Sequence, residues 1–405
     1  MLVTNSARLR STTPARHLLV ALVLVFATVA ASPGAAAGPP TGSGARAGAP
    51  SPDELRACFA GRTPETCLDG LFRRYLATHS TAEALRLLTA YEAAHVDLRL
   101  GCHPIVHAIG RETFRIKGTI HDAFAACDGT CHSGCYHGAV ERFLGGGTGG
   151  HVSQADLEAK AAEICRAPAS RYMKFQCLHG LGHALLYFSG YQLDTALAVC
   201  ESLQDPFAQR SCYGGVFMEN VAAAAVEKRD VSRTDYHYPC NRLNPKYGPD
   251  CYRMQTSRMT EMGLWPGGLF VECAKAGRFR PNCVESIGRD LSIHVRGQDR
   301  QWAADLCARR PAGDRTACIR GAVYALIDHS WDLRYALPFC AALHAGEDRA
   351  YCLRTSARYV AANRDASAES IERECRQHFA EGRVCRTVAE DATRAARGAP
   401  PWPHR

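Results

Sequence analysis

The sequence lacks any dense run of lysine and arginine, although its formal net charge is +8 at pH 7. Its arginines are spread along the chain, whereas a protein dedicated to nucleic acid would gather basic residues into a patch or stripe. The sequence therefore predicts no nucleic-acid partner.

Motifs of the common catalytic sites are also missing. No Ser–His–Asp order and no dinucleotide-binding glycine fingerprint stands out. The glycine-rich stretch 145–150 has no following lysine and no preceding strand, so we interpret it as a flexible insertion rather than a phosphate-binding loop. These absences leave open whether the chain is an enzyme.

Long apolar runs are absent except near the N-terminus. There, three arginines precede an apolar run over residues 18–31 that ends in small residues, which is the layout of a secretory signal peptide. The run is shorter than the roughly 20 residues that span a bilayer. We expect residues 1–37 to be a cleaved signal peptide and 38–52 a flexible leader. The mature protein would then be secreted or periplasmic, with no membrane span; an uncleaved anchor is the alternative.

Cysteine, in contrast, is abundant, with 20 in 405 residues. Ten of them recur at intervals of about 35 residues, and nine others each lie 8 to 12 residues before one of these ten. A fixed period of about 20–50 residues indicates a repeat architecture, in which each unit buries its apolar face against its neighbours. In an exported chain, such cysteines are expected to form disulfides.

Residues 302–330 illustrate one repeat. A first helix is expected to end at Cys307, and Pro311 and Gly313 then prevent it from continuing. A second helix, with apolar residues at helical spacing, begins near Cys318. Each repeat is therefore interpreted as a pair of helices with one cysteine on each side of the turn.

This order returns along the chain and predicts an all-α fold. We expect an α-solenoid of about nine to ten helix-pair repeats of about 35 residues over 53–395, each pinned by a local disulfide, with a disordered tail at 396–405. Facing ends of a helix pair can supply the Cα separation of about 4.4–6.8 Å that a disulfide needs. The predicted pairs are Cys58–Cys67, Cys127–Cys135, Cys165–Cys177, Cys200–Cys212, Cys240–Cys251, Cys273–Cys283, Cys307–Cys318, Cys340–Cys352 and Cys375–Cys385.

Two cysteines fall outside this scheme. Cys102 has no partner in the helix before it, and Cys131 lies between Cys127 and Cys135. We predict a tenth disulfide between Cys102 and Cys131. A Cys/His metal site built from these two and nearby histidines is an alternative. Covalent haem attachment is disfavoured because three residues, rather than two, separate Cys127 from Cys131.

The cysteine-pinned helix pairs resemble the tetratricopeptide and Sel1-like superfamily of α-solenoids. The resemblance covers about residues 53–395 and concerns only the period and the order of the helix pairs, because the signature Trp, Leu-Gly and Tyr positions of those repeats are not evident. It implies a concave face that binds a partner, here another protein or an anionic ligand.

A small residue often stands three positions after the second cysteine of a pair. Because a glycine inside a helix costs roughly 1 kcal/mol relative to alanine, its recurrence predicts close helix–helix approach; looser capping near the helix start is the alternative. These residues are Gly70, Gly138, Gly180, Gly215, Ser286 and Gly321.

Histidines are concentrated in residues 95–190, which hold nine of the 17. In three successive repeats, two potential ligands stand four residues apart and so share one helix face. Such pairs can bind zinc, copper, iron or nickel. The alternatives are imidazoles that bond backbone carbonyls within a repeat interface, and a pH-sensitive cluster. The predicted metal ligands are His103, His107, His137, Glu141, His179 and His183.

Farther along the chain, the same helix face becomes rich in arginine. Guanidinium groups bind carboxylate, sulfate or phosphate through paired hydrogen bonds, so this stripe predicts an anion- or substrate-binding groove; a solvated helix face is the alternative. The residues are Arg253, Arg289, Arg320, Arg354 and Arg358.

Together these features predict a secreted or periplasmic helical-repeat binding protein with a His/Glu transition-metal site on its concave face. The first alternative is a metal-dependent enzyme, in which Glu141 is a ligand or general base and the downstream arginines anchor a substrate. The second alternative is a structural or protein-interaction scaffold.

Overall fold

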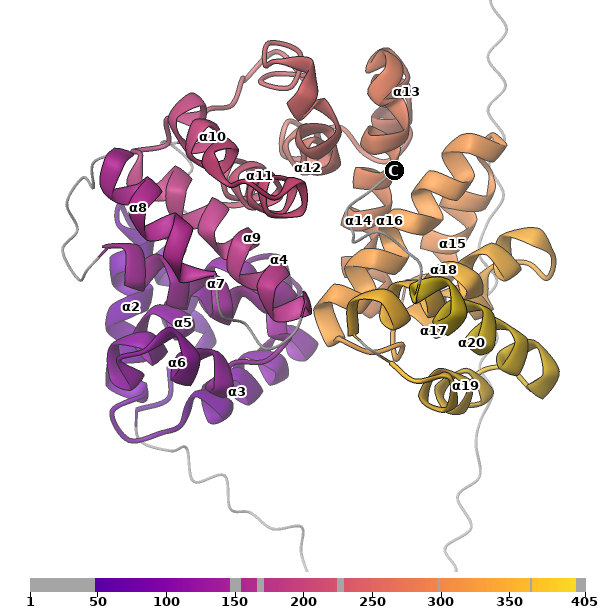
Figure 1. Cartoon of the computed structure of the whole chain (residues 1–405), viewed down its shortest axis with the longest axis horizontal. Helices are drawn as coiled ribbons and strands as arrows, with labels where there is room; N and C mark the ends of the chain where they lie inside the picture. The colour runs from indigo at the N-terminus through magenta and orange to yellow at the C-terminus, as the bar shows by residue number, and fades with distance from the viewer. Residues whose placement is uncertain are drawn as a thin grey trace, which may run out of the picture. The chain divides into compact units, whose positions relative to one another are not determined.

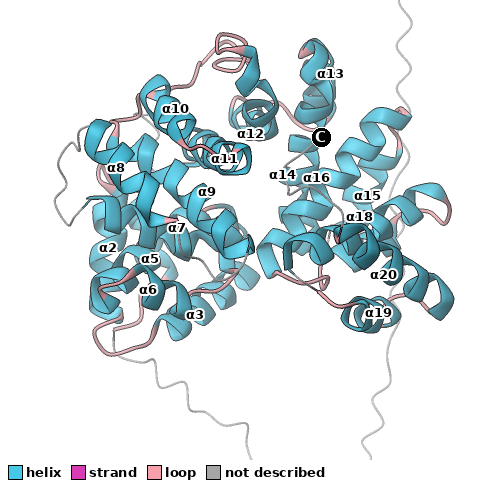
Figure 2. Cartoon of the chain, in the orientation of Figure 1, coloured by secondary structure: helices cyan, strands magenta, loops and turns pink. Residues whose placement is uncertain are grey.

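Every regular element in the described part of the chain is a helix, and no described residue lies in a strand (Figure 2). The predicted all-α fold is therefore confirmed. The predicted signal peptide, most of the predicted leader, all but the first residue of the glycine-rich stretch and residues 398–405 of the predicted tail lie outside the described residues. The computed structural model describes residues 48–145, 154–165, 171–223, 229–297, 299–364 and 366–397.

The described residues form twenty α-helices and two short 3-10 helices. Their bounds are α1 (Pro52–Ala60), α2 (Pro64–Tyr75), α3 (Thr81–Ala94), α4 (Val96–Leu100), α5 (Cys102–Lys117), α6 (Ile120–Ala126), α7 (Thr130–Gly145), α8 (Gln154–Ile164), α9 (Arg171–Phe188), α10 (Leu193–Ser202), α11 (Pro206–Ala222), η2 (Pro245–Tyr247), α12 (Gly248–Glu261), α13 (Gly267–Lys275), η3 (Gly277–Phe279), α14 (Arg280–Arg296), α15 (Arg300–Ala308), α16 (Ala312–Ser330), α17 (Ala336–Ala342), α18 (Glu347–Arg364), α19 (Ala368–Arg376) and α20 (Gly382–Ala396).

Local capping chemistry sets where several helices begin. At the start of α1, the Ser51 hydroxyl accepts the Glu54 N–H while the Glu54 carboxylate accepts the Ser51 N–H, which is a capping box. α11 begins with Pro206 after Asp205, whose carboxylate accepts the Phe207 N–H at 3.0 Å. The start of a helix in turn determines how far the following cysteine lies from the turn.

Nine disulfides each join a cysteine near the end of one helix or turn to one in the first turns of the next helix. Their Cα–Cα separations run from 5.3 to 5.7 Å. A disulfide of this kind stabilises a fold by about 2–4 kcal/mol. They are the nine predicted local pairs, Cys58–Cys67, Cys127–Cys135, Cys165–Cys177, Cys200–Cys212, Cys240–Cys251, Cys273–Cys283, Cys307–Cys318, Cys340–Cys352 and Cys375–Cys385.

The predicted tenth disulfide is absent, because Cys102 and Cys131 are both buried free thiols. Cys102 is the first residue of α5, and Cys131 lies in the first turn of α7. There, Cys131, His132 and Ser133 have φ angles of 50°, 57° and 64°, which place three consecutive residues in the left-handed region. The Cys131 Sγ donates a hydrogen bond to the Glu92 carboxylate at 2.8 Å instead of joining Cys102.

Glycines bring neighbouring inner helices into backbone contact. A Cβ added at Gly138 of α7 would lie 1.9 Å from the carbonyl oxygen of His107 in α5, and one added at Gly110 would lie 2.0 Å from that of Cys135. Only a residue without a Cβ fits at such a distance. The same reciprocal contact recurs between α9 and α11, and again between α14 and α16.

The predicted close approach is confirmed at four of the six small residues. Gly70 differs, because the nearest atom to a Cβ there would be 3.9 Å away, at the end of the Arg74 side chain. At Ser286 the contact is a hydrogen bond of 2.6 Å from the Thr256 hydroxyl. The four close contacts lie at Gly138, Gly180, Gly215 and Gly321.

The series of inner helices closes on itself. α7, α9, α11, α12, α14 and α16 pack in succession, and α16 packs against α7 again (Figure 1). At this closure the Trp331 Nε1–H donates to the Ser133 Oγ at 2.8 Å across 198 residues, and Trp331 stacks on Tyr136. The inner helices therefore surround a central cavity of about 240 Å³ in place of the expected open concave face.

Candidate metal centre

Four buried imidazoles converge between α5, α7 and α9. His103 and His107 come from α5, His137 from α7 and His183 from α9, and one nitrogen of each lies within 4.8 Å of the corresponding nitrogens of the other three. We call these residues the four-histidine group. The ring centroids of His137 and His183 are 4.8 Å apart, and those of His103 and His107 are 4.5 Å apart.

Hydrogen bonds determine which nitrogens of α5 are available as ligands. His103 Nδ1 lies 2.9 Å from the Cys131 carbonyl oxygen, and His107 Nδ1 lies 2.6 Å from Glu141 Oε1. Because these oxygens accept hydrogen bonds, both Nδ1 atoms carry the proton and both Nε2 atoms present a lone pair. The two Nε2 atoms are 3.1 Å apart. Two lone pairs that face each other at that distance repel, so a shared proton or a bound cation between them would stabilise the pair.

The other two histidines have the same arrangement. His137 Nε2 lies 3.1 Å from Gln176 Oε1, whose amide Nε2 donates to the Tyr172 hydroxyl at 2.6 Å. His183 Nδ1 lies 2.8 Å from Glu219 Oε2. The remaining nitrogens, His137 Nδ1 and His183 Nε2, are buried without a hydrogen-bond partner among the described residues. Metal-binding histidines characteristically donate their second ring nitrogen to such an acceptor.

Burial keeps three of these imidazoles in the neutral form. Together with repulsion from neighbouring imidazoles, it lowers the pKa of His103, His137 and His183 well below its usual value. Neutral imidazole is the form that binds metal, so no proton needs to be displaced from these rings at neutral pH.

Two carboxyl groups flank the four-histidine group. His107, Glu141, His183 and Glu219 form a second set of potential ligand atoms within 4.8 Å of one another. Burial alone would raise the pKa of Glu141, but His107 and Arg111 outweigh it and lower that pKa to about 2. Burial, and then the charge of Glu141, raises the pKa of Glu219 to about 8. The site therefore favours the addition of positive charge.

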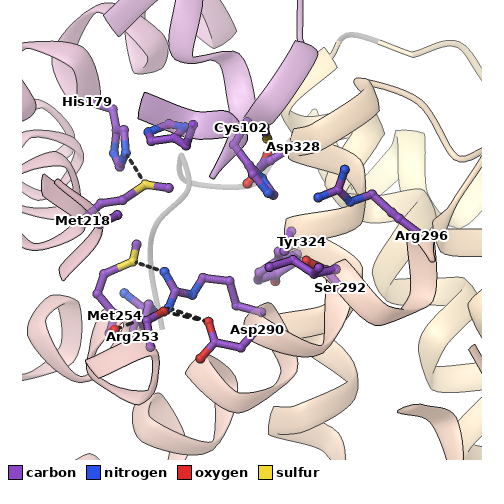
Figure 3. A pocket seen from close by; sticks show the side chains of 18 of the residues that line it. Cys102, His179, Met218, Arg253, Met254, Asp290, Ser292, Arg296, Tyr324 and Asp328 are labelled. Atoms are coloured by element: carbon purple, nitrogen blue, oxygen red, sulfur yellow. Dashed lines mark hydrogen bonds and ion pairs between the residues drawn. The ribbon is translucent and has the colours of Figure 1, made fainter. Parts of the chain in front are cut away.

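The sixth predicted ligand, His179, belongs to neither of these sets. Its ring centroid lies 5.1 Å from those of both His137 and His183, and its Nε2 lies 3.4 Å from the Met218 sulfur. Burial lowers the pKa of His179 to about 4. His179 and Met218 instead line the central cavity, where Figure 3 shows them pointing toward each other.

The glycine contacts also correct the alignment of the histidine-bearing helices. Counting from the cysteines aligns His103 with His179. In the structure, Gly110 of α5 occupies the place of Gly182 in α9, so His107, three residues before the glycine, is the equivalent of His179. His103 lies one helical turn earlier and reaches the four-histidine group from the first turn of α5. The pair His103 and His107 is therefore displaced from the pair His179 and His183 by one full helical turn, and not by the single residue that counting from the cysteines gives.

The structure separates the predicted arginine stripe into two parts. Arg253 and Arg289 line the central cavity, where Figure 3 labels Arg253, whereas Arg354 and Arg358 are exposed outside it. Arg320 forms an ion pair with Glu285. The arginines that line the cavity are also paired with carboxylates, Arg253 with Asp250 and Glu285 and Arg289 with Asp290.

The central cavity gives the four-histidine group a route to small molecules. His103 and His137 both belong to its wall, together with apolar Phe175, Met218 and Met254. Figure 3 shows side chains of α9 and α11 facing those of α14 and α16 across it. A small ligand in the cavity would thus meet two of the four imidazoles.

Three residues that orient the histidines were not predicted from the sequence. Gln176 places its amide oxygen against the second ring nitrogen of His137, and Glu219 places a carboxyl oxygen against that of His183. Arg111 donates a hydrogen bond of 2.6 Å to Glu141. Arg111 directly follows Gly110, as His183 follows Gly182, so alignment by glycine would have identified it. Glu219 and Gln176 do not stand at a spacing that recurs from repeat to repeat, so nothing in the sequence marked them as candidates.

Comparisons with protein families, with curated proteins and with solved structures find no match to this chain. Among the described residues, no helix combines the length and the apolar character that crossing a bilayer requires. Function must therefore be inferred from the residues of the site.

Proposed function

We propose that the protein is an exported helical-repeat protein that binds one transition-metal ion through His103, His107, His137 and His183. The observation that carries this proposal is the convergence of four imidazole nitrogens within 4.8 Å, while the second nitrogen of each ring faces an oxygen acceptor. Export is supported by the predicted signal peptide and by nine disulfides, which indicate an oxidising environment.

The charges around the four-histidine group suit a divalent cation. Glu141 lies against His107 and Glu219 lies against His183, so two carboxyl groups border the four imidazoles. A bound cation would favour the ionised form of Glu219, which then accepts the His183 Nδ1–H. An imidazole donor set suits zinc, copper, iron or nickel.

Metal analysis of the exported protein, purified without chelator, tests this proposal. We expect one equivalent of a transition metal per chain and its loss in His183→Gln, because glutamine keeps an N–H for Glu219 but removes the ligand nitrogen. The matched control is His121→Ala, which changes an exposed histidine outside the site. A folded wild-type chain that neither contains metal nor takes up zinc, copper, iron or nickel would overturn the proposal.

A metal-dependent enzyme is the second candidate, and the central cavity favours it. Catalytic zinc sites typically use three protein ligands and keep one position for water or substrate, whereas four histidines fill a tetrahedral shell. Catalysis would require the shell to expand or one histidine to leave. Turnover of a small substrate that disappears with the metal and returns with it would favour the enzyme over a binding protein.

We also propose kinship with the tetratricopeptide and Sel1-like superfamily. It is supported by the period and by the disulfide between the helices of each pair, and by no signature residue. The closed series of inner helices makes a cavity, rather than an open concave face, the expected place for a ligand.

A further inference from the structure

A second cluster of metal-binding side chains lies beside the four-histidine group. Glu92 from α3, Cys102 from α5 and Cys131 from α7 bring one carboxylate oxygen and two sulfurs within 4.8 Å of one another, and all three residues are buried. We call these residues the thiol cluster. It shares no residue with the four-histidine group.

The thiols of this cluster stand apart from all other cysteines in the chain, which form disulfides. The turn that carries Cys131 is held from two directions: His103 Nδ1 donates to the Cys131 carbonyl, and the Ser133 hydroxyl bonds to the Tyr172 hydroxyl and the Trp331 indole. Three consecutive non-glycine residues in the left-handed region persist only when their surroundings hold them. The surroundings thus fix Cys131 in place with its sulfur on Glu92.

Charges near the thiol cluster allow a divalent cation to replace two protons. Arg296 Nη1 lies 3.5 Å from Glu92 Oε2, its side chain is only 5% exposed, and its Nε is buried without a partner among the described residues. With both thiols protonated, Arg296 balances Glu92. With two thiolates, Glu92, Arg296 and a divalent cation, positive and negative charges balance again. A buried site tolerates such an exchange because its net charge does not change.

We propose that Glu92, Cys102 and Cys131 form a second metal site, for a thiophilic divalent cation of the zinc class. Binding forms two metal–sulfur bonds and releases the two thiol protons to solvent, with no change of oxidation state. Thiolate and carboxylate ligands suit zinc, and a water molecule can complete a tetrahedral shell.

The central cavity supplies the route and the open coordination position. Cys102 and Arg296 both line it, as Figure 3 shows. The two candidate sites are also joined through the backbone, because His103 follows Cys102 directly and donates to the Cys131 carbonyl. Occupancy of the thiol cluster would therefore hold His103 in the position that it takes in the four-histidine group.

The first test is the oxidation state of the two cysteines in the exported full-length mature protein. Alkylation under denaturing, non-reducing conditions followed by peptide mapping should label Cys102 and Cys131 and none of the other cysteines. A disulfide between Cys102 and Cys131 would overturn the proposal, because an oxidised pair offers no thiolate.

The second test is titration of the metal-stripped full-length protein with cadmium, followed by the ultraviolet charge-transfer absorption of the cadmium–thiolate bond. We expect this absorption to saturate at one cadmium per thiol cluster and to disappear in Cys131→Ser and in Cys102→Ser. Glu92→Gln leaves both sulfurs in place and should keep the absorption while weakening cadmium affinity at least tenfold. A folded wild-type chain with two free thiols that binds cadmium without this absorption overturns the proposal.

The control variant separates this inference from the proposed function. His183→Gln removes a ligand of the four-histidine group only, so the cadmium–thiolate absorption should persist in it. Loss of the absorption in His183→Gln, with helical content unchanged, would contradict an independent thiol site. Metal bound by the wild type without any thiolate absorption would leave the four-histidine proposal standing and reject the second site.

Discussion

Each histidine of the four-histidine group has one ring nitrogen directed at an oxygen atom. A partner of this kind fixes the tautomer and the ring orientation, so the opposite nitrogen presents its lone pair in a defined direction. Buried lone pairs without a partner are costly, since they have lost water and gained nothing. A bound cation would satisfy them.

At this scale we predict that Gln176→Leu weakens metal binding about 10- to 100-fold, because His137 loses the acceptor that orients it. Competition with a chromogenic chelator measures the affinity. Gln301→Leu, at an exposed site, is the matched control and should bind like the wild type. An unchanged affinity in a folded Gln176→Leu variant would show that Gln176 does not orient the ligand.

Residue spacing could predict the ligand types but not their second partners. A pair four residues apart shares a helix face in any α-helix, so His103 with His107 and His179 with His183 could be recognised as candidates. Their acceptors come from other helices or from a distorted turn. Nothing local predicts that Gln176 of α9 reaches a ring on α7.

Reciprocal glycine contacts are the main feature at the scale of helices. They bring α5 against α7, α9 against α11 and α14 against α16 closely enough for carbonyl oxygens to fill the space of a missing side chain. Helices at that separation also bring the side chains beside the contact together. His107, whose carbonyl meets Gly138, is one of the four histidines.

Gly138→Ala should therefore destabilise the fold by about 1–3 kcal/mol, because a Cβ 1.9 Å from the His107 carbonyl forces the helices apart. Gly70→Ala is the matched control, and we expect it to be neutral or to stabilise by up to about 1 kcal/mol through helix propensity. The urea concentrations at the unfolding midpoints of Gly138→Ala and Gly70→Ala measure the two changes in stability. Equal midpoints would mean that α5 and α7 separate at little cost.

The period and the local disulfides could be predicted because both depend on residues close in sequence. The register between neighbouring helices could not be read from the cysteines, because the equivalent glycine lies five residues after Cys177 but eight after Cys102. The position of the glycine, not that of the cysteine, decides which side chains meet.

Closure is the feature of the whole repeat domain that the sequence did not reveal. Whether a helical array remains open depends on small rotations between repeats that add up over many units. Here Trp331, which directly follows α16, contributes to the contact with α7 because it bonds Ser133 and stacks on Tyr136.

We predict that Trp331→Ala destabilises the protein by about 2–4 kcal/mol and raises amide hydrogen exchange in α7 and α16. The lost contacts join these two helices, so exchange in α19 and α20 should change little. Trp302→Ala removes a half-exposed tryptophan from another part of the molecule and serves as control. Equal exchange in α7 for both variants would contradict a closing role for Trp331.

The closure of the inner helices has a kinetic consequence for any ion that the protein holds. The four imidazoles come from residues 103–183, whereas α12, α14 and α16 complete the cavity wall from residues 248–330. As the chain emerges and folds from its N-terminus, the histidines can gather an ion before the rest of the wall arrives. Once the wall is complete, escape must wait for transient separation of α16 from α7 or for passage through the cavity. An ion that leaves by separation of α16 from α7 should have a residence time set by the lifetime of the Trp331 contact, whereas one that leaves through the cavity should be unaffected by Trp331→Ala.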